Sequence, residues 1–208
     1  MQPVPGTESA SAPSKGIASR LWSAARAEFS TRGYHGARVQ GIAHRAGCNV
    51  ALLYRHWTSK RALYLEVLSS VWTESSAAVA KLLERGQGPL GVVSAYLDAL
   101  LADAEGARIL VREYLDGAPF VRQLTERDPS VAEPFRRAVA TLAASNGSSL
   151  ARGLDPLMTA LAIAGVAALA ASAPEAAGAF FGTPPTREAW RHHLSDLLLH
   201  GLLRPEAR

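Results

Sequence analysis

The sequence has a single cysteine, Cys48, which excludes a disulfide bond within the chain. Aromatic residues are also few, at 7% of the chain, and no run of β-branched residues is bounded by turn residues as strands usually are. Alanine, leucine and arginine are abundant instead, and all three favour helix. Because 48% of the 208 residues are apolar, the chain can bury a core. We therefore expect a folded, all-α protein.

A segment that could span a membrane is missing as well. The stretch Leu157–Ala173 has 17 uncharged residues, but eight of them are alanine, whereas a spanning helix needs about 20 strongly apolar residues. The opening residues, MQPVPGTESASAPSKG, lack the apolar core of a signal peptide. We expect a cytoplasmic protein that makes no contact with a membrane, in which Leu157–Ala173 forms a buried helix.

Motifs for catalysis or for metal binding are also absent. The segment from Gly86 to Gly91 matches G-x-G-x-x-G, but it follows a predicted helix and contains a proline, so we interpret it as a loop. His193 and His200 could share a helix face, yet no cysteine or carboxylate completes a metal site there. A serine elbow, a Cys–His pair and a phosphate loop are missing too. We expect no enzyme activity, no metal and no cofactor.

Acidic residues are scarce in the first third of the chain. Residues 1–70 contain nine Lys and Arg against three Asp and Glu, whereas residues 71–208 contain thirteen against fifteen. The net charge of +4 therefore arises entirely from the N-terminal part, as in a polyanion-binding module joined to a second unit. A basic surface that is merely solvated would have the same composition, so charge alone leaves both interpretations open.

Apolar periodicity and turn residues divide the chain into helices. Residues 1–13, rich in proline and small polar residues, are expected to be disordered. Three short helices, one long helix and a series of further helices should follow, at 14–32, 39–46, 50–57, 59–85, 89–104, 106–116, 130–145, 155–171 and 187–203.

The helix at 50–57 is too short to be stable alone. Leu53 and Trp57 form an apolar strip that can pack on its neighbours, while the other face presents Val50, Ala51 and Tyr54. A helix, a glycine-containing turn and this second helix occupy the residues before Trp57, which is the order of a helix-turn-helix. In that motif the second helix enters the major groove of DNA with its N-terminal residues against the bases.

The segment from Phe29 to Leu68, FSTRGYHGARVQGIAHRAGCNVALLYRHWTSKRALYLEVL, resembles the DNA-binding domain of TetR-family transcriptional regulators. The resemblance covers about residues 15–70 and is only architectural beyond them. The features that carry it are Gly33-Tyr34, Ile42-Ala43, Ala46-Gly47, Leu53-Tyr54, Trp57 and Ser59-Lys60.

The resemblance implies roles for individual residues in DNA binding. Tyr54, His56 and Lys60 resemble phosphate contacts, and Arg38 with Gln40 lies where the second helix begins against the DNA backbone. The base-facing positions are matched by Asn49, Val50, Ala51 and Leu52. Val50 departs from the family pattern, in which a lysine or another polar residue is common, so contact with a thymine methyl would replace a hydrogen bond.

Two alternatives remain for these N-terminal residues. Tyr54 and His56 are also compatible with a solvated surface that binds nothing. Cys48 is either a small buried residue or a redox-active thiol beside a helix start.

For the rest of the chain, the resemblance implies a helical bundle that binds a small molecule and dimerises. The domains are then a tail at 1–13, a helix-turn-helix domain at 14–60 and a ligand-binding and dimerisation domain at 61–208. The candidate dimer interface comprises Leu157, Leu161, Ala164, Gly165, Ala168, Trp190, Leu194, Leu197, Leu198, Gly201 and Leu202. The alternative is that both of these helical stripes belong to the core within one chain.

The large side chains on the bundle helices are candidates for a ligand pocket. They would suit an apolar or aromatic effector, although each is also a plausible core residue. The candidates are Trp72, Tyr96, Tyr114, Phe120, Phe135 and Met158. Arg112 and Glu113 are either surface residues or groups that orient a polar part of the ligand.

These observations predict a homodimeric repressor that binds double-stranded DNA at a palindromic operator and is released by a small-molecule effector. A dimer would hold two reading helices about 34 Å apart, one turn of the duplex. An activator and a repressor without an effector are alternatives within this hypothesis. A different class, a helical small-molecule-binding protein or enzyme that does not act on DNA, is the principal alternative.

Overall fold

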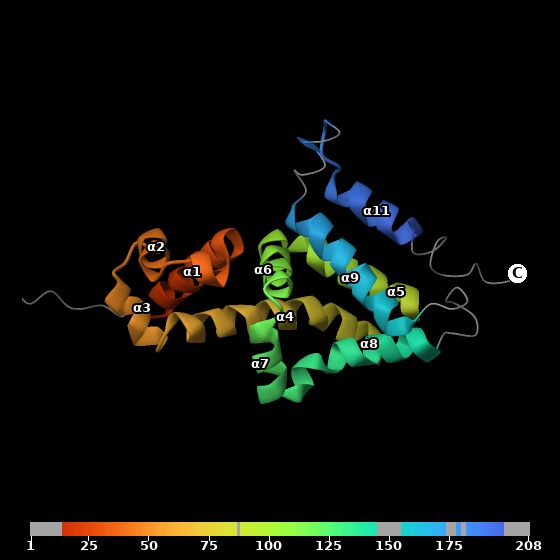
Figure 1. The fold of residues 1–208 in the computed structure, drawn as a ribbon, viewed down its shortest axis with the longest axis horizontal. Helices are drawn as coiled ribbons and strands as arrows, with labels where there is room; N and C mark the ends of the chain where they lie inside the picture. The colour runs from red at the N-terminus through yellow and green to blue at the C-terminus, as the bar shows by residue number, and fades with distance from the viewer. Residues whose placement is uncertain (1–13, 87, 145–154, 174–177, 180–181, 198–208) are drawn as a thin grey trace, which may run out of the picture.

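The computed structural model describes residues 14–86, 88–144, 155–173, 178–179 and 182–197. At one end of the molecule, α1 (Ser14–Gly36), α2 (Val39–Arg45) and α3 (Val50–His56) form a small group (Figure 1). The long helix α4 (Lys60–Glu84) runs from this group toward the opposite end. It is therefore shared by both parts of the molecule.

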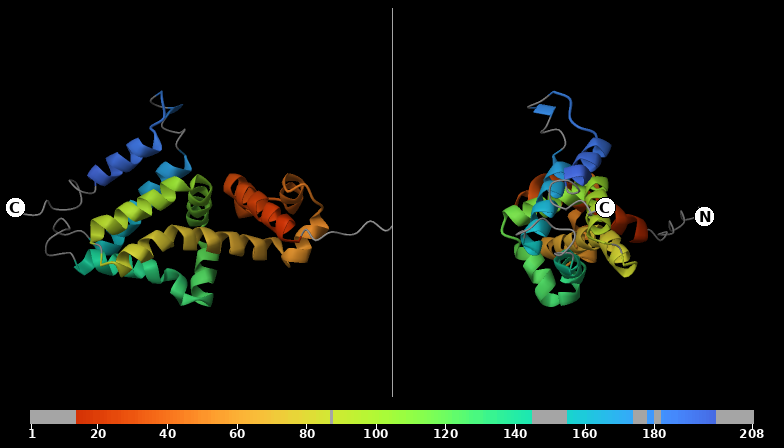
Figure 2. Two further views of the ribbon diagram at one scale, coloured as in Figure 1. Left: turned by 180° about the vertical axis from the view of Figure 1, so that it is seen from behind. Right: turned by 90° about the vertical axis from the view of Figure 1, so that its right-hand side faces the viewer.

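The remaining helices form the second part of the molecule. They are α5 (Pro89–Ala102), α6 (Ala104–Leu115), α7 (Pro119–Arg127), the 3-10 turn η1 (Pro129–Ala132), α8 (Glu133–Ala144), α9 (Pro156–Ser172) and α11 (Arg187–Leu197). In the views of Figures 1 and 2, α11 lies along the outer side of α5 and α9. No strand occurs in the described residues, which confirms the expectation of an all-α fold.

Local sequence signals explain where most helices begin. Proline occupies the first positions of α5, α7 and α9, where its missing N–H costs no hydrogen bond. The side-chain oxygens of Ser59, Asp103 and Asp155 accept from backbone N–H groups at the starts of α4, α6 and α9. Gly86, with φ +67°, follows the end of α4, and α5 begins three residues later. The glycine-rich segment therefore joins two helices.

Two features of the helices were not expected. The segment at 119–127 is a helix, although no helix was expected between residues 116 and 130. The first helix continues to Gly36 rather than ending at Arg32, because Gly33 adopts φ +66° and ψ 179° and the chain then resumes a helical turn. Both differences depend on contacts with other helices.

A continuous apolar core runs through the molecule. Phe29, Ile42, Leu53 and Leu63 are fully buried where the three short helices meet α4. The same core continues through the second half, where α6 packs against both α1 and α9. In Figure 1, α6 stands between the N-terminal group and the α5–α9 pair. In the described parts of the chain, no helix combines the length and apolarity needed to cross a membrane.

Candidate functional site

The turn between α2 and α3 has a tightly defined geometry. Gly47 has φ +65°, a conformation that glycine adopts without strain. Its N–H donates to the His44 carbonyl at 3.0 Å, and the Cys48 N–H donates to the Ala43 carbonyl at 3.0 Å. These two bonds form a Schellman motif, which ends α2 and fixes the direction in which the chain enters α3.

The short helix α3 is held by its inner face and by its ends. Leu53 is fully buried and Trp57 is 8% exposed, and the indole Nε1 of Trp57 donates to Glu66 Oε2 at 2.7 Å. At the N-terminus, Asn49 Oδ1 accepts from the Leu52 N–H at 2.9 Å. The helix is therefore positioned by its neighbours, while its outer face carries the 48% exposed Tyr54.

Most residues that the resemblance assigned to DNA binding are exposed in the structure. Arg38, Gln40, Asn49, Ala51, Tyr54 and His56 are exposed, and Val50 and Leu52 are partly buried. The side-chain oxygen of Asn49 is occupied by its role as a helix cap, so its NH2 group is the part left to donate to a partner.

Lys60 differs from the rest of that set. Its Nζ donates to the carbonyl of Tyr34 at 2.8 Å and to that of Ala37 at 3.1 Å, and it lies 4.5 Å from the centre of the Tyr34 ring. These contacts turn the ammonium group inward, because the end of α1 presents acceptors and an aromatic face directly to the start of α4. Lys60 thus fastens α1 to α4 in this structure and does not project outward as a phosphate contact would.

A polar cleft adjoins the start of α2. Glu28 on α1 is 4% exposed and pairs with Arg32 at 3.1 Å and with Arg45 at 3.8 Å. Gly41 permits this approach, since a Cβ there would lie 3.0 Å from Glu28 Oε1. The lining residues of the cleft are Glu28, Arg32, Arg38, Gln40, Gly41, His44 and Arg45. Sequence reasoning identified Arg38 and Gln40 but missed the neighbouring cations, whose only signal was their charge.

Cys48 is partly buried and packs against the apolar core. Among the described residues, no cluster of three or more His, Cys, Asp or Glu side chains could hold a metal ion.

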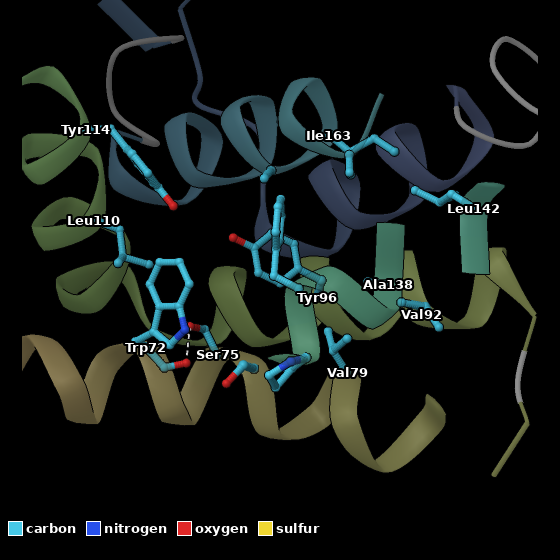
Figure 3. Close-up of a pocket in the computed structure, with 15 residues that line it drawn as sticks. Trp72, Ser75, Val79, Val92, Tyr96, Leu110, Tyr114, Ala138, Leu142 and Ile163 are labelled. Atoms are coloured by element: carbon cyan, nitrogen blue, oxygen red, sulfur yellow. Dashed lines mark hydrogen bonds between the residues drawn. The ribbon is translucent and has the colours of Figure 1, made fainter. Parts of the chain in front are cut away.

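A cavity lies between the helices of the second half. Its free interior is about 70 Å³ and is enclosed by α4, α5, α6, α8 and α9 (Figure 3). Four of the six predicted pocket residues line it, namely Trp72, Tyr96, Tyr114 and Phe135. The other lining residues are Ser75, Ser76, Val79, Val92, Leu110, Pro134, Ala138, Leu142, Ala160, Ile163 and Ala164.

The other two predicted pocket residues lie elsewhere. Phe120 is 8% exposed and its ring packs on those of Tyr34 and Tyr64, with centroids 4.5 and 4.9 Å away. The unexpected helix α7 carries Phe120 to the junction of α1 and α4. Met158 is 73% exposed, because it projects from the outer side of α9 while Ile163 projects inward.

The helix α6 connects the cavity with the N-terminal group. Leu110 and Tyr114 line the cavity, and Arg112 lies between them in sequence, about 200° around the helix from either. On that opposite face, Arg112 Nε donates to the Ser30 carbonyl at 3.2 Å, and a terminal guanidinium nitrogen donates to the Thr31 carbonyl at 2.8 Å. These carbonyls belong to the last regular turn of α1, so Arg112 caps that helix.

The start of α6 also contacts α1. Arg26 on α1 is largely buried and pairs with Asp103, the cap residue of α6, with Glu105 at 3.8 Å, and with Glu74 on α4 at 3.5 Å. Both ends of α6 are therefore bound to α1 by charged groups. Sequence reasoning did not identify Arg26 or Asp103, since nothing in the local pattern distinguishes them from surface charges.

Glu113, adjacent to Arg112, is buried and fully engaged. Its carboxylate accepts from the Phe120 N–H at 2.6 Å, from the Val121 N–H at 3.1 Å and from the Tyr64 hydroxyl at 3.0 Å. The carboxylate thus lies at the N-terminus of α7, where backbone N–H groups and the helix dipole favour negative charge. Burial, followed by the charge of Glu113, raises the pKa of Tyr64 well above its ordinary value.

The residues proposed for a dimer interface divide between two environments. Leu157, Leu161 and Leu197 are 48%, 51% and 50% exposed, and Gly165 is exposed as well. The remaining described members point inward: Ala168 and Leu194 are buried, Trp190 packs on the core and Ala164 lines the cavity. These four belong to the fold of one chain, because α11 and α9 pack on α5. Leu198, Gly201 and Leu202 lie outside the described residues.

The expectation that Leu157–Ala173 forms a buried helix is wrong for one side of α9, which is exposed although it is apolar. Met158, Val166 and Leu169 are 73%, 47% and 61% exposed and accompany Leu157 and Leu161 on this helix. Sequence reasoning missed the first three in this role, because α9 is apolar on all sides and its pattern does not indicate which face is inward.

The N-terminal helices are similar in sequence to known bacterial regulatory proteins. Residues 21–67 match the model of a family described as bacterial regulatory proteins, tetR family. The chain is 35% identical over 95 residues to the HTH-type transcriptional activator FasR of Mycolicibacterium smegmatis, covering 44% of this chain and 43% of that protein. It is 32% identical over 117 residues to the HTH-type transcriptional repressor Rv3405c of Mycobacterium tuberculosis, covering 56% of each. The chain spans about half the length of the curated relatives it matches.

Similarity to solved structures extends further along the chain. The putative transcriptional regulator SCO4942 from Streptomyces coelicolor has a TM-score of 0.60 and 25% identity, over 91% of this chain and 99% of that one. This solved structure therefore shares the helical architecture described above over most of the length of both chains.

Proposed function

We propose, from the match of residues 21–67 to the tetR family of bacterial regulatory proteins, that the chain is a sequence-specific DNA-binding transcriptional regulator of the cytoplasm. The observation that carries the proposal is the outer face of α3, which is exposed while its inner face is fixed by Leu53 and Trp57. Such a helix can enter the major groove without unfolding. Residues 14–60 would act as the DNA-binding domain, and residues 61–208 would bind the effector and a second copy.

Within this proposal, the surface residues have separate tasks. Val50, Ala51 and Leu52 would face base edges, with Asn49 donating from its NH2 group. Arg38, Gln40, Tyr54 and His56 would contact phosphates and fix the position of the helix on the duplex.

The second copy would pack on the exposed apolar face of α9. Single exposed apolar side chains are ordinary, but Leu157, Met158, Leu161, Val166 and Leu169 all lie on one helix. Burial of that face between two copies would remove it from water and pair two α3 helices for a near-palindromic operator.

An effector in the cavity would regulate DNA binding through α6 and α4. Both helices line the cavity and both contact α1, so a ligand that favours a different position of α6 would also move the DNA-binding domain. Release of DNA on ligand binding would make the protein a repressor. An activator is the second candidate, because one relative is named an activator and another a repressor.

The first test is selection of tight-binding duplexes from a random pool, followed by anisotropy titration of the selected duplex at two salt concentrations. We expect a palindromic duplex and a steep loss of affinity with salt, because each neutralised phosphate releases a counterion. Absence of any enriched duplex, together with salt-insensitive binding, would overturn the proposal and favour the alternative of a protein that does not act on DNA.

A matched pair of variants sharpens this test. Arg38→Ala should weaken binding to every duplex alike and lower the logarithmic salt slope by about 1. Arg136→Ala removes another exposed arginine, from α8 at the opposite end of the molecule from α3 (Figure 1), and should leave the slope unchanged. Equal effects of the two substitutions would show that binding reflects net charge and not the α2–α3 surface.

A further inference from the structure

The cavity contains no charged side chain among its lining residues. Its polar groups are mostly engaged with the backbone: Ser75 Oγ donates to the Val71 carbonyl at 2.7 Å, and Ser76 Oγ donates to the Thr73 carbonyl at 3.2 Å. The indole Nε1 of Trp72 donates to the Val131 carbonyl at 2.7 Å. These groups are already satisfied and offer little to a ligand.

Two hydroxyl groups are the exception. Those of Tyr96 and Tyr114 have no hydrogen-bond partner among the described residues, and in Figure 3 they turn toward each other across the cavity. Burial raises the pKa of both phenols, so they stay protonated at neutral pH. Each can therefore donate one hydrogen bond and accept another.

We propose that the cavity binds an uncharged molecule with an apolar body and one hydrogen-bonding oxygen, such as a ketone, ester, lactone or alcohol, whose oxygen lies between the Tyr96 and Tyr114 hydroxyls. The proposal rests on the assignment of this cavity as the effector site. The apolar body would contact Trp72, Phe135 and the aliphatic side chains around them. A free interior of about 70 Å³ has room for roughly five water molecules, hence for a short alkyl chain or a single ring.

A carboxylate ligand is disfavoured by the same surroundings. Arg112, which lies between the cavity-lining Leu110 and Tyr114 in sequence, is bound to two carbonyls of α1 and does not line the cavity. After burial, the negative charge of Glu113 raises the pKa of Tyr114, and the same charge would repel an anion bound beside that phenol. An anion would lose its hydration without gaining a counter-charge, and that loss is large.

A cationic ligand is the other class to be excluded. Aromatic faces attract quaternary ammonium groups, and four aromatic side chains line this cavity. The remaining walls, however, are aliphatic, and no carboxylate lines the interior to balance a positive charge. The two free hydroxyls would also stay unsatisfied beside such a ligand, which offers them no acceptor.

The test uses four probes of similar length: methyl hexyl ketone, n-octane, octanoate and hexyltrimethylammonium. Binding to the full chain without DNA is followed by the fluorescence of Trp72, with Trp72→Phe as the control for the origin of the signal. We expect the ketone to bind at least about tenfold more tightly than octanoate or the ammonium probe, as expected from the cost of burying an unpaired charge.

Tyr96→Phe and Tyr114→Phe should each lower the affinity for the ketone about fivefold, the equivalent of one hydrogen bond, and leave the affinity for n-octane unchanged. Tyr34→Phe removes a hydroxyl outside the cavity and should change neither value. Retention of full ketone affinity in both cavity variants would overturn the proposal.

Tighter binding of octanoate or of the ammonium probe would also overturn it, as would failure of all four probes to bind. Because the assay contains no DNA, its outcome is separate from that of the regulator hypothesis. Ketone binding without any effect on operator affinity would uphold the ligand class and reject effector control. Operator binding without ketone binding would uphold the regulator hypothesis and reject the ligand class.

Discussion

The contacts of Lys60 show how one side chain can stabilise the joint between α1 and α4. Its ammonium group satisfies two carbonyls at the end of α1 and lies over the ring of Tyr34. Hydrogen bonds to a charged group are stronger than neutral ones, and their loss leaves buried acceptors without a partner. The position of this residue is thus set by the fold, whatever it contributes to DNA binding.

Lys60→Ala should accordingly lower the free energy of unfolding by about 1–3 kcal/mol. The salt slope of operator binding should stay as in the parent protein, in contrast to that of Arg38→Ala. Urea denaturation and anisotropy titrations measure the two quantities. A reduced slope with unchanged stability would instead support the phosphate contact implied by the family resemblance.

Two tyrosines make the stability sensitive to alkaline pH. Burial raises the pKa of Tyr64 and Tyr96 above the ordinary value of 10.0. Above that pH the unfolded chain loses protons that the folded chain retains, so the folded state is progressively disfavoured.

The free energy of unfolding should therefore fall above pH 10, by up to about 1.4 kcal/mol per pH unit for each tyrosine that ionises only on unfolding. Urea denaturation at several pH values measures the decrease. Tyr96→Phe should make it shallower, whereas Tyr54→Phe, on the exposed face of α3, should not. A stability that stays constant through this range would contradict the buried state of these hydroxyls.

Among the helices, α6 is the element that connects the cavity with the N-terminal helices. Arg112 binds the end of α1 from the face opposite to the one that carries Tyr114. Arg26 and Asp103 fasten the other end. A shift of α6 would therefore strain its contacts with α1. These contacts would then differ between two positions of α6, as the proposed regulation requires.

Arg112→Ala should reduce the coupling between effector and operator. We expect the ratio of operator Kd values with and without methyl hexyl ketone to move toward one by about fivefold or more, since coupling energies are typically 1–3 kcal/mol. The ketone affinity of the variant without DNA should stay the same. Arg136→Ala is the control, and equal ratios in the two variants would exclude α6 as the connecting element.

The elements that could be predicted from the sequence are those with local signals. Gly47 indicates the turn before α3, and Asn49 indicates the N-cap of that helix. Both act as expected in the structure. The helix α7 could not be predicted, because its start is capped by Glu113 of another helix and its Phe120 is held by Tyr34 and Tyr64. These interactions join residues distant in the sequence.

The same limit applies to the candidate sites. Trp72, Tyr96, Tyr114 and Phe135 line the cavity as expected, but Phe120 has the same chemistry and lies elsewhere, because its helix is positioned by tertiary contacts. The roles of these residues toward a ligand stay predictions. On α9, alanine and leucine surround the helix evenly, so only the packed structure shows that Ala168 faces inward and Leu169 outward.

At the scale of the whole molecule, the exposed apolar face of α9 determines the proposed assembly. Leu169→Glu would place a charge on that face, where a second copy would otherwise exclude water. We expect a shift from dimer to monomer in analytical ultracentrifugation and a loss of operator affinity of at least about tenfold, since one reading helix would then act alone.

Leu115→Glu is the matched control for this substitution. Leu115 is 81% exposed as the last residue of α6 and does not belong to the apolar face of α9, so the same change should affect neither mass nor affinity. A monomeric parent protein, or a Leu169→Glu variant that stays dimeric, would locate the contact between copies on another surface.

The length of α4 has a mechanical consequence. A helix of 25 residues is about 37 Å long, at a rise of about 1.5 Å per residue. A tilt of only about 5° at the cavity end would sweep the far end through about 3 Å, close to the 3.4 Å that separates neighbouring base pairs. A displacement inside the cavity too small to disturb its packing could thus carry α3 out of register with its half-site by one step of the double helix.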